Sequence, residues 1–471
     1  MAKKLWLILL GIVTLGFVIR VYKIQSLPMY GDELTMVYDE YSILKTGMDA
    51  TGQKFPLTFK MGAGRPGGYI YFSVPFVAVF GPTLWGERTL SLLSGLGIIV
   101  LMYFLGKKLF NEKVGIIASL LTAVCPWDIY LSRAGFEAHF ALFLALLGVV
   151  FFLDKKYIGW AIAWGLTIFT YPTFKLTLPL MLIFLVFWKG IKDIVKDKIF
   201  WIGIVVLAVF GLIIGYQTFF AGSEQRFFSL NIFSDETIKN NIIQTVDNDR
   251  NFATLPIVFK DIFINREIEY GRLLLDNYVA NLSPDFLFLR GDGQPRDNPG
   301  EMGMLYLIDF PLLIAGLVLL WKDERKKFTL LLAWILITPL ATMFFMNPHA
   351  LRNDLMIPPL LVIISYAFTK ISRKFTYVAI ALIAIQLIYI LVHIYNIAPA
   401  KFVSFWSADA ESVALKAIQA QKSGQKVTLN VTKVDNIEYA YEVYAKLDPR
   451  EVIAQSGKFP KVYGNVTITD K

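Results

Sequence analysis

Long apolar runs, separated by short clusters of basic residues, dominate the chain. Eleven of these runs approach the ~20 residues that an α-helix needs to cross a bilayer. The expected spans are 5–22, 88–106, 114–131, 136–153, 157–172, 175–188, 199–220, 303–321, 328–346, 355–369 and 375–396. A shorter run, 69–80, contains Pro75 and predicts a re-entrant or interfacial helix. The pattern therefore predicts an all-α, multi-pass membrane protein.

The basic residues indicate how these spans are oriented. If the N-terminus is cytoplasmic, each short inner segment holds a cluster of lysines and arginines, as cytoplasmic loops usually do. The three short outer turns hold one base each, Arg133, Lys175 and Arg352. If 69–80 were counted as a full span, every later cluster of basic residues would lie on the exoplasmic side of the membrane. We therefore expect eleven spans in the plasma (inner) membrane, with a cytoplasmic N-terminus.

Two long outer loops and a C-terminal segment follow from this topology. The loops 23–87 and 221–302 would lie on the exoplasmic face and belong to a transmembrane module, 1–396. Residues 397–471 combine helical periods with strand-like runs such as "KVTLNV" at 426–431. This segment predicts a small exoplasmic α/β domain.

Composition excludes several classes of protein. Of the 471 residues, 56% are hydrophobic and 18% are charged, whereas a soluble domain has ~25% charged residues. A soluble multidomain enzyme and a disordered chain are thus excluded. The net charge is +9, but the bases lie in clusters that set topology, so no nucleic-acid partner is expected. The single cysteine, Cys125, excludes an intrachain disulfide and a cysteine-based metal site.

An acidic pair at the start of the first outer loop is the leading candidate for catalysis. Asp32 and Glu33 follow Gly31, about ten residues after the first span. Acidic residues also favour helix N-termini, so capping is the alternative. Partial desolvation at a membrane surface would raise the carboxyl pKa and suit a general base.

Bases on the outer side are the candidates for binding a phosphate. Arg133, Lys175 and Arg352 are exceptions to the topology rule, His349 lies beside Arg352, and Arg296 lies in a loop rich in Gly and Pro. A bound phosphate would compensate these charges. Pairing with nearby acids, or an interfacial side chain that reaches water, is the alternative.

Further candidates for substrate binding lie in the same outer segments. They are Arg65, Arg88, Glu137, His139, Tyr171, Arg290 and Asp292. For Arg290 and Asp292 the alternative is a solvated turn. The three histidines are scattered, without the spacing of metal ligands. No metal-binding residue is therefore predicted, although a divalent metal stays possible.

Taken together, these segments resemble the GT-C glycosyltransferases. They most resemble the family 39-like branch, which includes protein O-mannosyltransferases and lipid A aminoarabinose transferases. The resemblance covers about 30–350 and rests on "GDE" at Asp32 and Glu33, on Arg88, and on "PWDIYLSRAGFEAHFAL", "SPDFLFLRGDGQPRDNPG" and "PHALR". Leu34 and Asp128 depart from the residues that are frequent in the family.

The resemblance implies a GT-C fold and an inverting transfer on the exoplasmic face. The donor would be a polyprenyl-phosphate-linked sugar, a hexose or a pentose, and the acceptor a hydroxyl of a lipid, glycan or protein. It also implies that Asp32 is the base. Outer bases would then stabilise the departing polyprenyl phosphate, while membrane lipids and the lipid tail contact the spans.

Three other functions remain as alternatives. A lipid-linked sugar flippase or transporter would place ionisable residues at mid-membrane depth, but here they lie at the outer ends of the predicted spans. An O-antigen polymerase-like or ligase-like enzyme would use a large late loop with Arg and His, without an early acidic loop. A non-enzymatic scaffold would need neither the acidic pair nor the outer bases.

Overall fold

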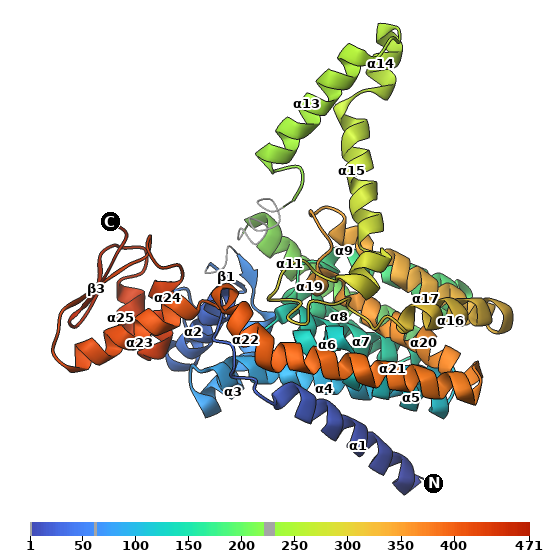
Figure 1. Cartoon of the computed structure of the whole chain (residues 1–471), viewed down its shortest axis with the longest axis horizontal. Coiled ribbons are helices and arrows are strands. Elements are labelled where there is room, and N and C mark those ends of the chain that lie inside the picture. Colours follow the sequence, from blue (N-terminus) through green and yellow to red (C-terminus); the bar gives the residue numbers. More distant parts are fainter. Residues whose placement is uncertain (1, 61–63, 221–230) are drawn as a thin grey trace.

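A bundle of helices forms the body of the molecule (Figure 1). The computed structural model describes residues 2–60, 64–220 and 231–471. The first half of the bundle consists of α1 (Ala2–Val21), α4 (Leu84–Leu109), α5 (Glu112–Val124), α6 (Pro126–Leu131), α7 (Glu137–Leu153), α8 (Tyr157–Thr170), α9 (Phe174–Lys189), α10 (Ile191–Val195) and α11 (Lys198–Phe220). The second half consists of α16 (Asp309–Asp323), α17 (Arg325–Ile337), α18 (Pro339–Thr342), α19 (Ala350–Asn353), α20 (Ile357–Lys370) and α21 (Arg373–Val392).

Within the described ranges, five helical segments are long and apolar enough to cross a membrane. They are Lys3–Val21, Leu84–Leu109, Lys198–Tyr216, Ala350–Lys370 and Arg373–Lys401. In Ala350–Lys370, 89% of the apolar window is buried inside the protein, against 17% in Lys198–Tyr216 and in Arg373–Lys401. The helix α20 is therefore central, whereas α11 and α21 lie on the perimeter, where apolar side chains face outward.

The other six predicted spans also contain helices, and all of these except α9 are shorter than predicted. The helices α5, α7, α8, α9, α16 and α17 have 13 to 17 residues. The run 114–131 is interrupted at Cys125, because Pro126 has no N–H to continue the α-helical pattern and instead begins α6. The predicted number of eleven crossings thus stays a prediction.

The first long loop folds onto one end of the bundle. It contains α2 (Gly31–Thr46), α3 (Gly68–Phe80) and an antiparallel pair of short strands, β1 (Thr58–Phe59) and β2 (Arg65–Pro66). The helix α2 begins with a capping box in which the Glu33 carboxylate accepts the N–H of Tyr30 at 3.2 Å. It ends at Gly47, whose positive φ of 69° suits a glycine. This start places Asp32 in the first turn.

The second long loop projects from the body as a helical hairpin. Its helices are α13 (Glu236–Phe252), α14 (Ile257–Phe263) and α15 (Arg266–Ala280), drawn in green and yellow-green in Figure 1. A π-helical turn, Asp285–Leu289, leads from the hairpin back to the bundle. Residues 221–230 of this predicted loop lie outside the described residues.

The C-terminal segment contains both helices and strands. Its elements are α22 (Ala398–Lys401), α23 (Ala408–Lys422), β3 (Val427–Asn430), α24 (Ile437–Tyr444), α25 (Pro449–Ala454), β4 (Lys461–Tyr463) and β5 (Val466–Thr469). The strand order is β3-β5-β4, with β3 parallel and β4 antiparallel to β5. Leu34 and Tyr38 of α2 belong to the same hydrophobic cluster as Ala414, Tyr441 and Val466. The segment therefore shares its core with the first loop, and the predicted boundary at 397 stays a prediction.

Candidate active site

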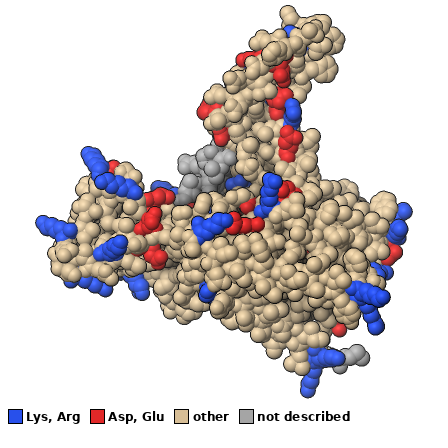
Figure 2. Space-filling view, in the orientation of Figure 1, with Lys and Arg blue, Asp and Glu red and all other residues tan. Residues whose placement is uncertain are grey.

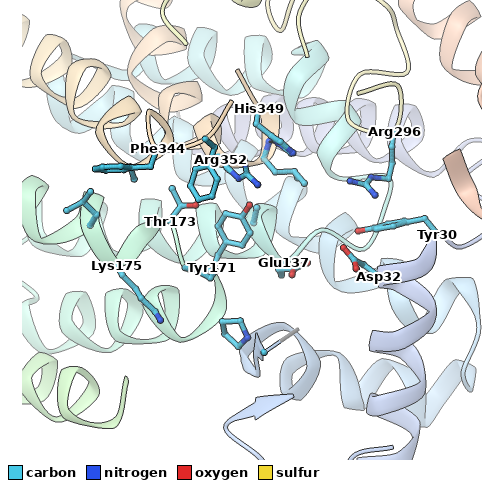
Figure 3. Close-up of a pocket in the computed structure, with 18 residues that line it drawn as sticks. Tyr30, Asp32, Glu137, Tyr171, Thr173, Lys175, Arg296, Phe344, His349 and Arg352 are labelled. Atoms are coloured by element: carbon cyan, nitrogen blue, oxygen red, sulfur yellow. Dashed lines mark hydrogen bonds between the residues drawn. The ribbon is translucent and has the colours of Figure 1, made fainter. Parts of the chain in front are cut away.

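One pocket lies where the ends of several bundle helices meet the loops. It encloses about 270 Å³. Its wall is formed by the start of α2, the start of α7, the turn between α8 and α9, the loop before α16 and the connection from α18 to α19. Its ionisable side chains are Tyr30, Asp32, Glu137, Tyr171, Lys175, Arg296, His349 and Arg352 (Figure 3).

Asp32 and Glu137 reach the pocket together and share one guanidinium. The side chain of Asp32 is 31% exposed, and its Oδ1 lies 2.8 Å from Nη2 of Arg65. Nε of the same arginine lies 3.2 Å from Oε1 of Glu137. Burial lowers the pKa of Arg65, but Asp32 and Glu137 outweigh that effect and raise it above its usual value. Arg65 therefore stays charged and aligns both carboxylates at the edge of the pocket.

Glu33 faces away from the pocket, although it is adjacent to Asp32. Its buried carboxylate accepts two hydrogen bonds from Arg88, from Nε and Nη2, each at 2.7 Å. It also accepts the N–H of Gly135 at 2.7 Å and that of Tyr30. Arg88 in turn donates to three backbone carbonyls of the segment after α1. The two adjacent acids thus occupy different environments, and only Asp32 is accessible to a substrate.

Four of the five bases predicted to bind phosphate line this pocket. They are Lys175, Arg296, Arg352 and His349. The guanidinium of Arg296 lies 4.5 Å from the ring centroid of Tyr30, and that of Arg352 lies 4.0 Å from the ring centroid of Phe345. These aromatic contacts hold the guanidiniums at the pocket wall. The pocket therefore has an acidic side, at Asp32, and several cationic groups.

Arg133 lies outside this pocket. Its Nη1 donates to the carbonyls of Arg20 at 2.7 Å and Tyr22 at 2.8 Å, and its Nη2 donates to that of Lys23 at 3.1 Å. The last carbonyls of a helix have no partner within the helix, so a guanidinium at this place caps the end of α1. Neither phosphate binding nor an acidic partner is needed to explain this residue.

The remaining candidates divide between the pocket and other sites. Tyr171 lines the pocket, whereas Arg290 is 84% exposed and lies 3.4 Å from Asp285. His139 is fully buried beside Asp128, which forms an ion pair of 2.5 Å with Arg20. Asp128, which departs from the family pattern, therefore links α6 to α1 through this ion pair.

A carboxylate–imidazole group borders the pocket at His349. Asp292, Asp297 and His349 each offer one ligand atom, and these atoms lie within 4.8 Å of one another. Oδ2 of Asp297 is buried and has no hydrogen-bond partner among the described residues. Two carboxylates and an imidazole suit a divalent metal, so this group could hold one. The sequence does not predict this group, because His349 comes from a different segment than Asp292 and Asp297 and only tertiary packing brings the three together.

The pocket also contains apolar residues that no sequence pattern singled out. Phe344, Phe345 and Leu351 lie on its wall beside Arg352. In the sequence they are indistinguishable from the apolar residues of the neighbouring predicted spans. An apolar wall next to cationic groups can accommodate an amphiphile with an anionic head.

The comparisons with known proteins agree with this fold. The family model for dolichyl-phosphate-mannose-protein mannosyltransferases matches residues 65–214. Among solved structures, ArnT from Cupriavidus metallidurans bound to undecaprenyl phosphate matches with a TM-score of 0.60 and 11% identity, over 95% of this chain and 85% of that one. The apo state of the same protein matches with a TM-score of 0.55 and 13% identity, over 94% and 85%.

An archaeal oligosaccharyltransferase has a similar structure. AglB from Archaeoglobus fulgidus, in complex with an inhibitory peptide and a dolichol-phosphate, matches with a TM-score of 0.53 and 13% identity, over 94% of this chain and 64% of that one. No curated protein sequence matches the chain significantly. The chain has the fold of GT-C glycosyltransferases, and the resemblance to protein O-mannosyltransferases and lipid A aminoarabinose transferases is confirmed.

The different environments of Asp32 and Glu33 predict different effects on stability. Glu33→Gln removes the charge that compensates the buried Arg88, and we expect it to lower the free energy of unfolding by ~3–5 kcal/mol. Asp32→Asn changes a partly exposed group, so its effect should stay below ~1 kcal/mol. Thermal unfolding of the purified protein in detergent measures both. Equal losses in the two variants would contradict the separate roles.

Proposed function

We propose that the chain transfers a sugar from a polyprenyl-phosphate-linked donor to a hydroxyl acceptor, with inversion at the anomeric carbon. The observation that carries this proposal is that the carboxylate of Asp32 and the cationic groups of Lys175, Arg296 and Arg352 meet in one pocket. The fold shared with ArnT bound to undecaprenyl phosphate, and with AglB in complex with a dolichol-phosphate, supports a lipid-phosphate donor.

Asp32 is the proposed general base. As the acceptor oxygen forms its bond to the anomeric carbon, Asp32 takes the hydroxyl proton, and the bond from that carbon to the phosphate oxygen breaks. The leaving phosphate keeps the electron pair. Arg65 favours the ionised form of Asp32, which a base requires, and Glu137 shares the charge of Arg65. The role of Glu33 is to position α2, through its bonds with Arg88 and Gly135.

The cationic groups bind and stabilise the departing polyprenyl phosphate. A phosphate leaving group needs little protonation. Fixed positive charge therefore supplies most of the stabilisation that its negative charge requires. Lys175, Arg296 and Arg352 provide that charge, and His349 provides a further polar contact. A divalent metal held by Asp292, Asp297 and His349 would add positive charge on the same wall.

The wall of the pocket also suits the other parts of the substrates. The lipid tail would lie against Phe344, Phe345 and Leu351, while the sugar and acceptor lie near Tyr171 and Glu137. We place this pocket on the exoplasmic side of the plasma (inner) membrane, because the short segments at the opposite ends of the helices carry the lysine clusters.

Removing the base should abolish most of the activity. We expect Asp32→Asn to lower kcat by ~10²–10⁴-fold, because general-base catalysis contributes about that much. The assay follows release of undecaprenyl phosphate from a panel of undecaprenyl-phosphate-linked hexoses and pentoses. Asp285→Asn, a change of the same chemistry outside the pocket, should turn over like the wild type. Wild-type turnover by Asp32→Asn would refute the assignment.

Removing one cationic group should weaken phosphate binding. A hydrogen bond to a charged group contributes ~1.5–3 kcal/mol, so Arg352→Gln should weaken binding of undecaprenyl phosphate by roughly 10–100-fold. Titration of the purified protein with that lipid measures the change. Arg290→Gln and Arg133→Gln serve as matched controls, since neither side chain lines the pocket. Similar losses in all three variants would argue against a specific phosphate site.

Binding of the lipid phosphate should depend on the protonation of Asp297. Burial raises the pKa of Asp297 to about 7, although Arg296 lowers it and Asp292 raises it further. Below that pH the carboxyl is neutral, so Asp297 does not compensate the positive charge that Arg296 contributes to the pocket. As the pH rises through about 7, the new negative charge should weaken binding of undecaprenyl phosphate.

The variant Asp297→Asn isolates this effect from other titrations. The phosphate of the lipid titrates in both proteins, so the difference between the two binding curves reports Asp297. We expect the affinity of the wild type, relative to the variant, to fall severalfold as the pH rises from about 6 to about 8. A constant ratio across this range would rule out the proposed dependence.

A further inference from the structure

The projecting hairpin ends in an apolar tip. Five of the seven residues of α14 are apolar, and Phe252 and Leu255 precede them. These seven side chains, which we call the tip, are Phe252, Leu255, Ile257, Val258, Phe259, Ile262 and Phe263, and they are 46% to 85% exposed. Figure 2 shows the end of the hairpin as almost uniformly uncharged. Such a continuous exposed apolar cluster usually marks a contact with lipid or protein.

The few charged groups near the tip are paired within the hairpin. Asp261 forms an ion pair with Arg250, and Nζ of Lys260 donates to the carbonyl of Arg250 at 2.8 Å. These contacts lower the cost of taking the charged groups out of water. A surface that bound a charged protein partner would instead present such groups outward.

The direction of the hairpin places the tip beside the membrane. In Figure 1 the hairpin extends across the direction of α1, α4 and α21, which would run through the membrane. Its base is attached to the pocket end of the bundle, where the hydroxyl of Tyr278 donates to the carbonyl of Leu336 at 2.9 Å. A hairpin that leaves the helix ends in this direction runs along the membrane surface.

The apolar surface also continues from the tip along the hairpin. On α15 the exposed side chains of Ile268, Leu275 and Val279 are spaced seven and four residues apart, so they share one face. The helix α11, which precedes the hairpin in the chain, lies on the apolar perimeter of the bundle. The perimeter of the bundle and the hairpin thus both expose apolar side chains.

We propose that this hairpin lies on the leaflet at the pocket end of the bundle, with its tip inserted among the phospholipids. Insertion is driven by burial of apolar surface, because the hairpin offers no excess of basic residues for anionic headgroups. The docking does not depend on the chemistry in the pocket, so its failure would leave the proposed glycosyl transfer intact.

The base of the hairpin connects this docking to the pocket. The N–H of Ile232 donates to the carbonyl of Phe344 at 3.0 Å, and the side-chain amide of Asn277 donates to the carbonyl of Met343 at 3.1 Å. Phe344 belongs to the apolar wall of the pocket. A hairpin whose tip is inserted in the leaflet therefore holds the apolar wall of the pocket at the depth in the membrane from which a lipid tail would enter.

Site-directed fluorescence in nanodiscs tests the insertion. The single native cysteine, Cys125, is buried and can be replaced with Cys125→Ala. In this background Phe259→Cys in the full chain carries an environment-sensitive bimane label, and the discs contain phosphatidylcholine with brominated acyl chains. We expect bromine to quench this label severalfold more than a label at Asp247→Cys, an exposed polar site on α13.

Two further measurements complete the test. Adding Ile262→Ser and Phe263→Ser should reduce the quenching at position 259, because the tip loses apolar area. Replacing half of the phosphatidylcholine by phosphatidylglycerol should leave the quenching unchanged. Equal quenching at positions 259 and 247 would overturn the proposal. Protection of the label from aqueous iodide without quenching by bromine would also overturn it, since a second copy of the chain would then cover the tip.

Discussion

The buried ion pair between Glu33 and Arg88 is the interaction on which the rest of the site depends. Both side chains are almost fully buried, and each charge is compensated by the other and by backbone groups. Such a pair is stable only when all of its hydrogen-bonding groups are satisfied. Because its partners come from α2, α4 and the segment before α7, the pair fixes three elements at once. The position of Asp32 in the pocket follows from this arrangement.

The two adjacent acids at the start of α2 differ in exposure and in their charged partners. Glu33 is buried with its own arginine, whereas Asp32, one residue earlier, is partly exposed and shares Arg65 with Glu137. On the opposite wall the guanidinium of Arg352 lies against an aromatic ring. Charged residues of the same type thus stabilise the fold where they are buried and line the pocket where they are partly exposed.

The sequence predicts the parts of this structure that depend on local pattern. The helices follow from apolar runs, and Lys175 and Arg352 stand out because basic residues are rare in outer turns. The same reasoning selects Arg133, whose guanidinium caps α1 outside the pocket, because a topological exception does not reveal what the side chain contacts. Asp297 and Phe344 could not be predicted, since their place in the pocket depends on tertiary packing between distant segments.

The shared core of α2 and the C-terminal segment has a consequence for the timing of assembly. The hydroxyl of Tyr38 donates to the carbonyl of Leu447 at 3.1 Å, and Leu34 packs in one cluster with Val466. When the ribosome has completed α2, these partners are still almost the whole length of the chain away. The helix that carries Asp32 can therefore reach its final packing only after β5, which contains Val466, has been synthesised.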